Sequence, residues 1–388
     1  MLHSVSPAHG SRCRSAALLL GLLALGTSVA RAAEPAPTEA ESVPVASEPS
    51  ENPDADVSKR VTPTIELEAR VISGFEVQRE RPSGAQTHPG ENDFGFDVRQ
   101  ARVQLKSELG RFRLELSLDL SDALSQDIGG GYNSPPFLRD ASLEYRYSKA
   151  LRLQVGRYKR PFSRIELESA ANLPVVRRGL LNGLLVQDNQ WGDRAVGAMI
   201  SGRLELAKLR WYLSLTNPSW STSLQSQGMD AIGRVQLSPV KGLSLGVDGG
   251  YKYLRLGSEG QWTHNFAVGG DVAWKLGEAH LLLEGHFGEL PFETASPQGF
   301  GVLAMLDYVL DLNESWALQP VLFAEVADAD AELSQTESTR LALGLNLLAE
   351  GGFRLLPQVA LVRPLGRASQ QNPWLESETY SLIFSLAL

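Results

Sequence analysis

The sequence has little that could hold a protein together other than burial and backbone pairing. Its single cysteine, Cys13, lies near the N-terminus, which excludes a disulfide framework. No later apolar run approaches the roughly 18 to 20 residues that a membrane-spanning helix needs, so a helical membrane protein is excluded. Basic residues are also in the minority, with 36 Lys and Arg against 45 Asp and Glu and a net charge of −9. This balance argues against nucleic acid as a partner.

Recognisable motifs for metals and cofactors are absent as well. Gly129, Gly130 and Gly131 lie in a predicted loop that no helix follows, so they do not form a phosphate-binding turn. The sequence therefore predicts neither a metal nor a cofactor.

The first 62 residues read as two segments that precede the folded domain. Arg12 and Arg14, the apolar run 16–25 and the small residues up to Ala32 have the order of a secretory signal peptide, residues 1–32. Residues 34–57 then contain five prolines and seven acidic residues but no basic or aromatic residue. Such a composition cannot bury enough apolar surface to order itself, so 33–62 is predicted to be a disordered periplasmic linker. The domain proper is then 63–388.

From Thr64 onward the hydrophobic pattern has a period of two, which is typical of strands with two unlike faces. In Arg111–Leu120, charged and small polar residues alternate with Phe112 and four leucines. Clear alternation recurs in 65–77, 138–147, 151–155, 209–215, 243–253, 266–274, 341–347 and 380–388, and weaker alternation in 96–108, 194–204, 229–238, 279–289, 300–310, 315–326 and 352–363. The total is sixteen strands. The pattern in 96–108 changes phase, which predicts a β-bulge near Arg99.

The connections between these strands alternate strictly in length. Short turns, such as Gly110 and 148–150, alternate with long connections, the longest of which is 159–193. Short turns on one side and long loops on the other are typical of a bacterial outer-membrane β-barrel. An even number of strands closes the sheet, as lipid requires. The predicted fold is an all-β, sixteen-stranded antiparallel transmembrane barrel whose third external loop folds inward.

The same alternation assigns the two faces of the wall. The leucine face of 112–120 should meet outer-membrane lipid, because a basic residue at mid-depth there would cost roughly 2 to 4 kcal/mol. The polar face should line the lumen, where its basic residues are Arg102, Lys106, Arg113, Arg146, Arg210 and Arg234. Mixed charges could equally pair across strands and brace the wall.

The long connection 159–193 and its flanks are rich in arginine. Eight basic residues oppose Glu166, Glu168, Asp188 and Asp193: Arg152, Arg157, Lys159, Arg160, Arg164, Arg177, Arg178 and Arg194. Basic rings favour anions in pores, and the guanidinium fork suits phosphate and carboxylate. The segment is therefore predicted to form a positive constriction. The alternative is that Arg177 and Arg178 pair with Glu166 and Glu168 and merely fasten the segment to the wall.

Several motifs resemble the phosphate-selective porin O and P family. They are 96–102 (FDVRQAR) with Leu105 and Gly110, 139–145, and above all 155–163 (VGRYKRPFS), followed by Glu166, Arg177–Arg178 and 192–197 (GDRAVG). The resemblance implies a sixteen-stranded barrel, usually a homotrimer, in which the loop after the fifth strand folds inward as a constriction. The last strand, from Tyr380 to Leu388, also resembles the signal that the outer-membrane insertion machinery recognises.

The expected function is passive diffusion of small hydrophilic solutes through an outer-membrane porin, with a preference for anions such as phosphate. Two alternatives stay open. One is a barrel enzyme, a lipase or protease, because His280, Glu284 and His286 share one strand face and could support acid–base chemistry. No serine with a positioned partner is recognisable, so we expect no enzyme. The other is a plugged structural barrel without conductance.

Overall fold

The computed structural model of the protein describes residues 62–81, 92–121, 137–218, 226–256, 260–291, 296–333, 336–365 and 376–387. The predicted signal peptide, all but the last residue of the predicted linker, and Leu388 lie outside these ranges. Among the described residues, no helix is both long and apolar enough to cross a bilayer.

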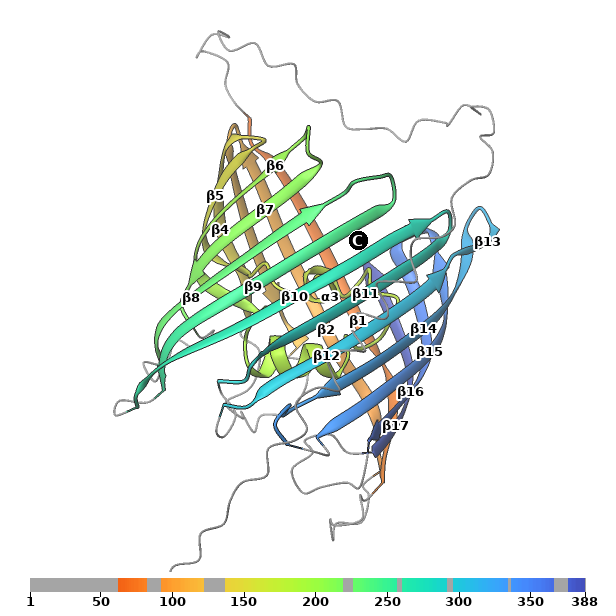
Figure 1. The fold of residues 1–388 in the computed structure, drawn as a ribbon. Coiled ribbons are helices and arrows are strands. Elements are labelled where there is room, and N and C mark those ends of the chain that lie inside the picture. The colour runs from red at the N-terminus through yellow and green to blue at the C-terminus, as the bar shows by residue number, and fades with distance from the viewer. Residues whose placement is uncertain are drawn as a thin grey trace, which may run out of the picture. The chain divides into compact units, whose positions relative to one another are not determined.

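The described part of the domain consists almost entirely of antiparallel strands (Figure 1). They are β1 (Thr64–Arg81), β2 (Asn92–Leu109), β3 (Phe112–Asp119), β4 (Leu138–Ser148), β5 (Leu151–Lys159), β6 (Arg194–Leu204), β7 (Leu209–Thr216), β8 (Ser226–Leu237), β9 (Leu243–Leu256), β10 (Trp262–Leu276), β11 (Ala279–Glu289), β12 (Gln298–Tyr308), β13 (Leu310–Asn313), β14 (Trp316–Asp328), β15 (Glu337–Ala349), β16 (Phe353–Pro364) and β17 (Glu376–Ala387). The helices are α3 (Arg164–Leu167), the π-helical η2 (Asn182–Asp188) and the 3-10 turn η3 (Glu350–Gly352).

The sheet closes on itself as a sixteen-stranded barrel. Strand β1 pairs with β2 on one edge and with β17 on the other, from Arg70 opposite Ala387 to Arg81 opposite Glu376. Strands β12 and β13 are separated only by Val309, and both pair with β14, so they count as one strand of the wall. Closure leaves no free edge, as a solvent that cannot hydrogen-bond the backbone requires. The predicted fold class and strand number are confirmed.

The predicted bulge is present at the predicted residue. Opposite β1, Ile72 pairs with Gln100 and Ser73 pairs with Val98, so Arg99 is the extra residue in β2. A one-residue insertion shifts every later side chain to the other face. This is why the apolar positions of β2 change from even to odd.

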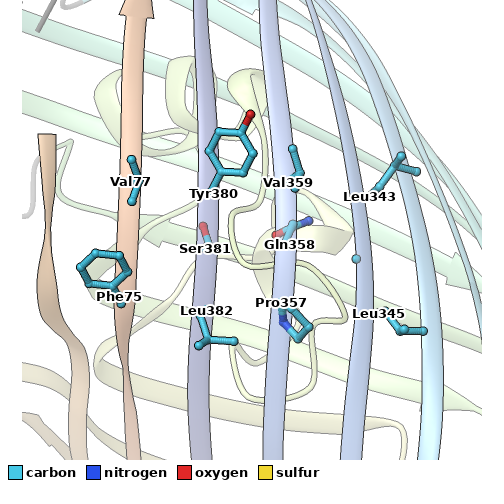
Figure 2. A pocket seen from close by; sticks show the side chains of 11 residues that line it. Phe75, Val77, Leu343, Leu345, Pro357, Gln358, Val359, Tyr380, Ser381 and Leu382 are labelled. Carbon is cyan, nitrogen blue, oxygen red and sulfur yellow. The ribbon is translucent and has the colours of Figure 1, made fainter. Parts of the chain in front are cut away.

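The outward face of the wall is apolar and exposed. Leu114, Val155 and Leu382 are between 40 and 46% exposed, although they lie in regular strands. Figure 2 shows part of this face where β1, β15, β16 and β17 form a shallow groove of about 530 Å³ lined by Phe75, Val77, Leu343, Leu345, Val359, Tyr380 and Leu382. Such a band of exposed apolar side chains is the surface that a lipid-embedded barrel presents.

Candidate functional site

The connection between β5 and β6, residues 160–193, is the longest described loop and contains both α3 and η2. Its side chains and backbone contact the inward faces of strands that come much later in the chain. Asn346 of β15 donates to the Pro174 carbonyl at 2.8 Å, and Arg354 of β16 donates to the Leu173 carbonyl at 2.8 Å. In Figure 1 the α3 ribbon is drawn within the ring of strands, in agreement with these contacts.

Three apolar clusters join the segment to the wall. In the first, Phe162, Leu185 and Trp191 are fully buried against Ile232 of β8 and Ala267 of β10. The second cluster packs Ile165, Leu173 and Val175 against Leu282, Leu303, Met305, Val321, Phe323, Ala342 and Ala360, and the third packs Ala170 and Val176 against Ile72, Leu356 and Ile383. The sequence predicted a charged interior throughout. Over β11 to β17, by contrast, much of the inward face is apolar because the segment covers it.

Arg160 is the centre of a fully buried polar anchor. Its side chain is 0% exposed, and its Nη1 donates to Asp230 Oδ2 at 2.7 Å. Its Nε donates to the Asp193 carbonyl at 2.8 Å, and a further bond reaches the Gln190 carbonyl. Lys252 of β9 pairs with the same Asp230 carboxylate and lies 4.8 Å from the Trp191 ring centroid. Arg160 is therefore a fastening residue and is not available to a solute.

A second anchor surrounds Glu284 of β11. The Ser163 hydroxyl donates to Glu284 Oε1 at 2.5 Å, and the Ile165 amide donates to Oε2 at 2.9 Å. The Glu284 neighbour is His286, whose Nε2 lies 3.2 Å from Asp248 Oδ1. Ser163 is thus a serine with a positioned carboxylate partner, which the sequence did not reveal. It is only 1% exposed.

The third anchor depends on a glycine. Glu325 of β14 accepts bonds from the Leu180 and Leu181 amides, each at 2.7 Å. Gly179, just before them, has φ +112, and a Cβ there would lie 2.5 Å from Glu325 Oε2. Only glycine combines this backbone conformation with such a close approach.

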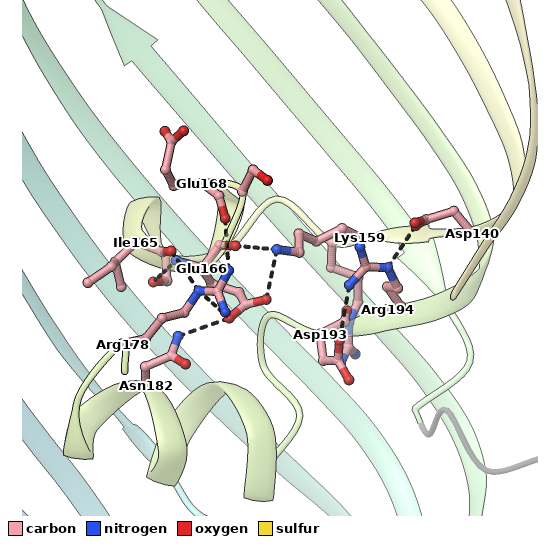
Figure 3. Close-up of polar contacts among 12 residues, drawn as sticks. Asp140, Lys159, Ile165, Glu166, Glu168, Arg178, Asn182, Asp193 and Arg194 are labelled. Carbon is pink, nitrogen blue, oxygen red and sulfur yellow. Dashed lines mark hydrogen bonds and ion pairs between the residues drawn. The ribbon is translucent and has the colours of Figure 1, made fainter. Parts of the chain in front are cut away.

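Glu166 links the start of the segment to its middle (Figure 3). Its carboxylate lies 2.9 Å from Lys159 Nζ and 3.4 Å from Arg178 Nε, and it accepts from Asn182 Nδ2 at 3.2 Å. Burial, the largest single influence, raises the pKa of Glu166, but the charges of Lys159 and Arg178 together with the hydrogen bonds lower it to about 2. The carboxylate is thus ionised and shields two of the predicted constriction cations.

Most of the other predicted constriction residues also have protein partners. Arg178 donates to the Ile165 and Glu168 carbonyls and lies 3.4 Å from Glu166, so its partners lie within the segment. Arg194 pairs with Asp140 at 2.8 Å, and Arg157 donates to the Arg139 carbonyl at 3.0 Å. Arg164 donates to Ser244 Oγ at 3.1 Å and lies 3.5 Å from Asp271.

Arg177 and Arg152 are different. Arg177 pairs with Glu76 of β1 at 3.0 Å, not with Glu166 or Glu168, and its side chain is 54% exposed. Arg152, half-buried on β5, has no hydrogen bond or ion pair to any described residue.

The predicted lumen-wall cations also divide into those with acidic partners and one, Arg210, without a partner among the described residues. Arg234 is buried between Asp248 and Asp271, and Arg102 pairs with Asp119 at 3.2 Å. Lys106 pairs with Glu68, Arg113 lies 3.9 Å from Glu108, and Arg146 pairs with Glu108 at 2.9 Å and Glu144 at 2.6 Å. Arg210 is exposed and has no partner among the described residues.

The sequence analysis did not identify Glu325 and Glu76, whose carboxylates accept hydrogen bonds from the segment. Glu325 is the one charged residue on the inward face of β14, after Val321 and Phe323. A lone charge on an otherwise apolar strand face would have been a usable signal, because an unpaired buried charge is costly.

Comparison with known proteins agrees with this architecture. The sequence profile of phosphate-selective porin O and P matches residues 65–273. None of the curated proteins matches the sequence. An anion-selective porin from Comamonas acidovorans superposes with a TM-score of 0.60 at 11% identity, covering 84% of this chain and 100% of that one.

Two further solved structures share the fold. The outer-membrane channel DcaP of Acinetobacter baumannii has a TM-score of 0.57 at 9% identity, over 85% of this chain and 99% of its own. The trimer form of OmpT, an outer-membrane protein of Vibrio cholerae, has a TM-score of 0.54 at 11% identity, over 84% and 99%. At such identities these likenesses show the fold alone, whereas the profile match spans more than half of the sequence. The chain belongs to the phosphate-selective porin O and P family.

Proposed function

We propose that this integral bacterial outer-membrane porin passes small hydrophilic solutes by passive diffusion and prefers anions. We also propose that residues 160–193 fold inward as its constriction. The contacts of this segment with β8 to β17 support an inward position, and its internal ion pairs support a fixed aperture. The solutes would then pass along the wall that the segment leaves uncovered.

The anion preference rests on one arrangement in that uncovered wall. Arg146 of β4 lies directly opposite Arg152 of β5, and Arg203 of β6 lies directly opposite Arg210 of β7. Like charges opposite each other on neighbouring strands are destabilising. In each pair one arginine has an acidic partner, Arg146 with Glu144 and Arg203 with Glu205 at 3.3 Å, and the other has none among the described residues. Arg152 and Arg210 are therefore the cations available to a passing anion, and the exposed Arg177 adds a third.

We propose the preference for phosphate on the basis of the same arginines. Most arginines of the constriction are neutralised by Asp230, Asp140 and Glu166, so selection by charge should be moderate. The similarity to an anion-selective porin supports the sign of the preference.

The test is the reversal potential of the purified porin in planar bilayers under gradients of potassium chloride and potassium phosphate. We expect anions to be more permeant than potassium. The double variant R152Q/R210Q should lower the ratio of anion to cation permeability about fivefold, since a unit charge about 4 Å away in water is worth about 1 kcal/mol. The control is R79Q, because Arg79 lies on the outward face near Tyr380. A cation-selective wild type, or equal ratios in both variants, would contradict the proposal.

We further propose that the protein is not an enzyme. Ser163 is the serine nearest to a reactive arrangement, but its hydroxyl faces Glu284, and no substrate can reach a side chain that is 1% exposed. A homotrimer is our proposal for the assembled state, supported by the family resemblance. The molar mass of the detergent-solubilised porin, measured by light scattering, tests it.

A further inference from the structure

One carboxylate in the lumen, that of Glu76, is shared by two arginines from distant parts of the chain. Glu76 lies on the inward face of β1, nearer to the end of the strand that leads into a long connection, and long connections mark the external side of a bacterial barrel. Its Oε2 pairs with Arg99 of β2 and lies 3.0 Å from Arg177 Nη2 of the segment 160–193. Its Oε1 accepts from the Ser381 hydroxyl at 2.6 Å.

The β-bulge in β2 brings Arg99 to this carboxylate. The next residue, Gln100, pairs opposite Ile72 and is buried. Arg99, the extra residue, contacts Glu76 and donates to the Val176 carbonyl at 3.3 Å, so its side chain also reaches the inside of the barrel. Regular alternation would have turned one of two successive residues outward. Bulges re-aim side chains in this way and are over-represented next to functional sites.

Arg177 is the accessible member of the group. Its side chain is 54% exposed, whereas the side chains of Arg99 and Glu76 are 18% and 16% exposed. The buried Arg340 of β15 donates to the Arg177 carbonyl at 3.2 Å and lies 5.0 Å from the Phe323 ring centroid. This contact fixes the backbone of Arg177 and leaves its guanidinium free to turn from Glu76 toward an anion in the lumen.

Positive charge exceeds negative charge in this group. Glu76 is the one carboxylate within ion-pair distance of Arg99 and Arg177 in the described part of the chain. Glu325, which also contacts the segment, is buried and is occupied by the Leu180 and Leu181 amides. Two guanidinium groups against one carboxylate leave a single positive charge, which attracts anions even while Glu76 is in place.

The Glu76 carboxylate shows which chemistry the two arginines accept. It is bound by guanidinium and hydroxyl donors, which bind carboxylates and phosphates equally well. In a pore, binding must be favourable enough for the solute to enter and weak enough for it to leave. A resident carboxylate that competes for the same arginines weakens the binding of a passing anion and favours its release.

We propose that Glu76 is a specificity-determining residue that acts as an internal counter-anion. An entering small carboxylate or phosphate displaces Glu76 from Arg177, and Glu76 pairs with Arg177 again when the solute leaves. Glu76 thereby limits how tightly the porin holds anions. The inference rests on the anion preference proposed above.

The test compares E76Q with E80Q in the purified full-length porin in planar bilayers. Both changes remove one inward carboxylate of β1 at nearly constant volume, but Glu80 accepts from Gln78 at 2.8 Å and has no basic partner among the described residues. E76Q should raise the ratio of anion to cation permeability about fivefold, because the attraction of a unit charge about 4 Å away in water changes an equilibrium by about that factor. E80Q should raise it less than about twofold, because salt screens a more distant charge.

Block of the potassium chloride current by potassium phosphate gives a second readout. Half-block of E76Q should need about fivefold less phosphate than half-block of the wild type. The gain should disappear in E76Q/R177Q, because Arg177 is the exposed arginine of the group. E76D keeps the charge and should stay closer to the wild type. A purely structural Glu76 would instead give a noisier current in E76Q and E76D with an unchanged permeability ratio, and that result would overturn the inference.

Line broadening of the phosphorus NMR signal of potassium phosphate by the detergent-solubilised porin measures binding without any current. Tighter binding by E76Q than by E80Q, in a porin that proves cation-selective, would refute the proposed anion preference and support the role of Glu76. An anion-selective wild type with equal permeability ratios in E76Q and E80Q would overturn the role of Glu76 and leave the proposed function standing.

Discussion

The barrel has two lumenal walls that are built alike and used differently. Strands β2 to β7 and strands β8 to β17 have the same antiparallel ladders and the same exposed apolar exterior. On the first wall, inward cations such as Arg113 and Arg146 are about 30% exposed. On the second, Arg234 and Lys252 are almost completely buried.

The difference comes from the segment that covers the second wall. There, charges serve as anchors: Arg234 and Lys252 each pair with a carboxylate, and the buried Arg340 donates to the Arg177 carbonyl at 3.2 Å. On the first wall, Arg152 and Arg210 lack acidic partners among the described residues. Under the function proposed above, the same residue type would fasten the segment on one wall and support selectivity on the other.

The largest contrast between the walls should come from removing a buried carboxylate. Asp230→Ala removes the carboxylate that Arg160 and Lys252 share in a fully buried site, which should lower the free energy of unfolding by about 3 to 5 kcal/mol. Glu108→Ala on the first wall removes a partly exposed carboxylate and should cost less than about 1 kcal/mol. Urea unfolding in detergent, followed by tryptophan fluorescence, measures both. Similar losses would refute the distinction between the walls.

Truncation of a side chain should also cost more stability on the second wall than on the first. Phe323→Ala opens a cavity under the segment, where Phe323 is 0% exposed, and should cost about 3 to 5 kcal/mol. Gln104→Ala removes a hydrogen bond to Glu115 on the first wall and should cost about 1 kcal/mol. The same unfolding assay applies, and a cost below about 1 kcal/mol for Phe323→Ala would show that the segment does not pack there.

Acidification should loosen the segment 160–193 itself, because the partners of Glu166 are Lys159 of β5 and Arg178 and Asn182 of the segment. The pKa of Glu166 is lowered from 4.5 to about 2, so its stabilising contribution is fully present above about pH 4.5 and is lost as the pH falls through 2. The contribution amounts to about 3 kcal/mol. Channel noise should rise between pH 4.5 and 2 in the wild type. In Glu166→Gln it should already be high at pH 7, and a quiet variant at neutral pH would contradict the assignment.

A smaller effect is expected from the glycine that approaches Glu325. Gly179→Ala combines φ +112 with a clash against the carboxylate and should cost about 1 to 3 kcal/mol. Gly183→Ala, within η2, meets nothing within 4 Å and is the matched control. Single-channel recording should show flickering only in Gly179→Ala. Identical traces would mean that this anchor does not hold the segment.

Much of the wall could be predicted from the sequence, because lipid imposes a strict alternation of side chains. The bulge at Arg99 was predictable for the same reason, since one extra residue reverses the phase of the pattern. The weakly alternating stretches 279–289, 300–310, 315–326 and 352–363 have a physical explanation. On the inward face of these strands, some positions are apolar because they pack against the segment, as Leu282, Leu303, Phe323 and Ala360 do, and this weakens the alternation.

The partners of the basic residues could not be predicted in this way. Alternation places Arg234 and Arg210 on the same inward face. Only the fold shows that Arg234 meets Asp248 and Asp271, whereas Arg210 meets no acidic residue in the described part of the chain. One of the two interpretations paired Arg177 with Glu166 or Glu168, but Arg177 pairs with Glu76, about one hundred positions earlier in the chain. Contacts between a long loop and distant strands leave no periodic signature.

The anchors of the segment also constrain how the protein is assembled. Asp230, Glu284, Glu325 and Arg354 all belong to strands that follow the segment in the chain. These four attachment points do not exist until β8 to β16 have joined, whereas Glu76 of β1 precedes the segment in the chain. Docking of the segment on the second wall is therefore a late step in the assembly of the barrel.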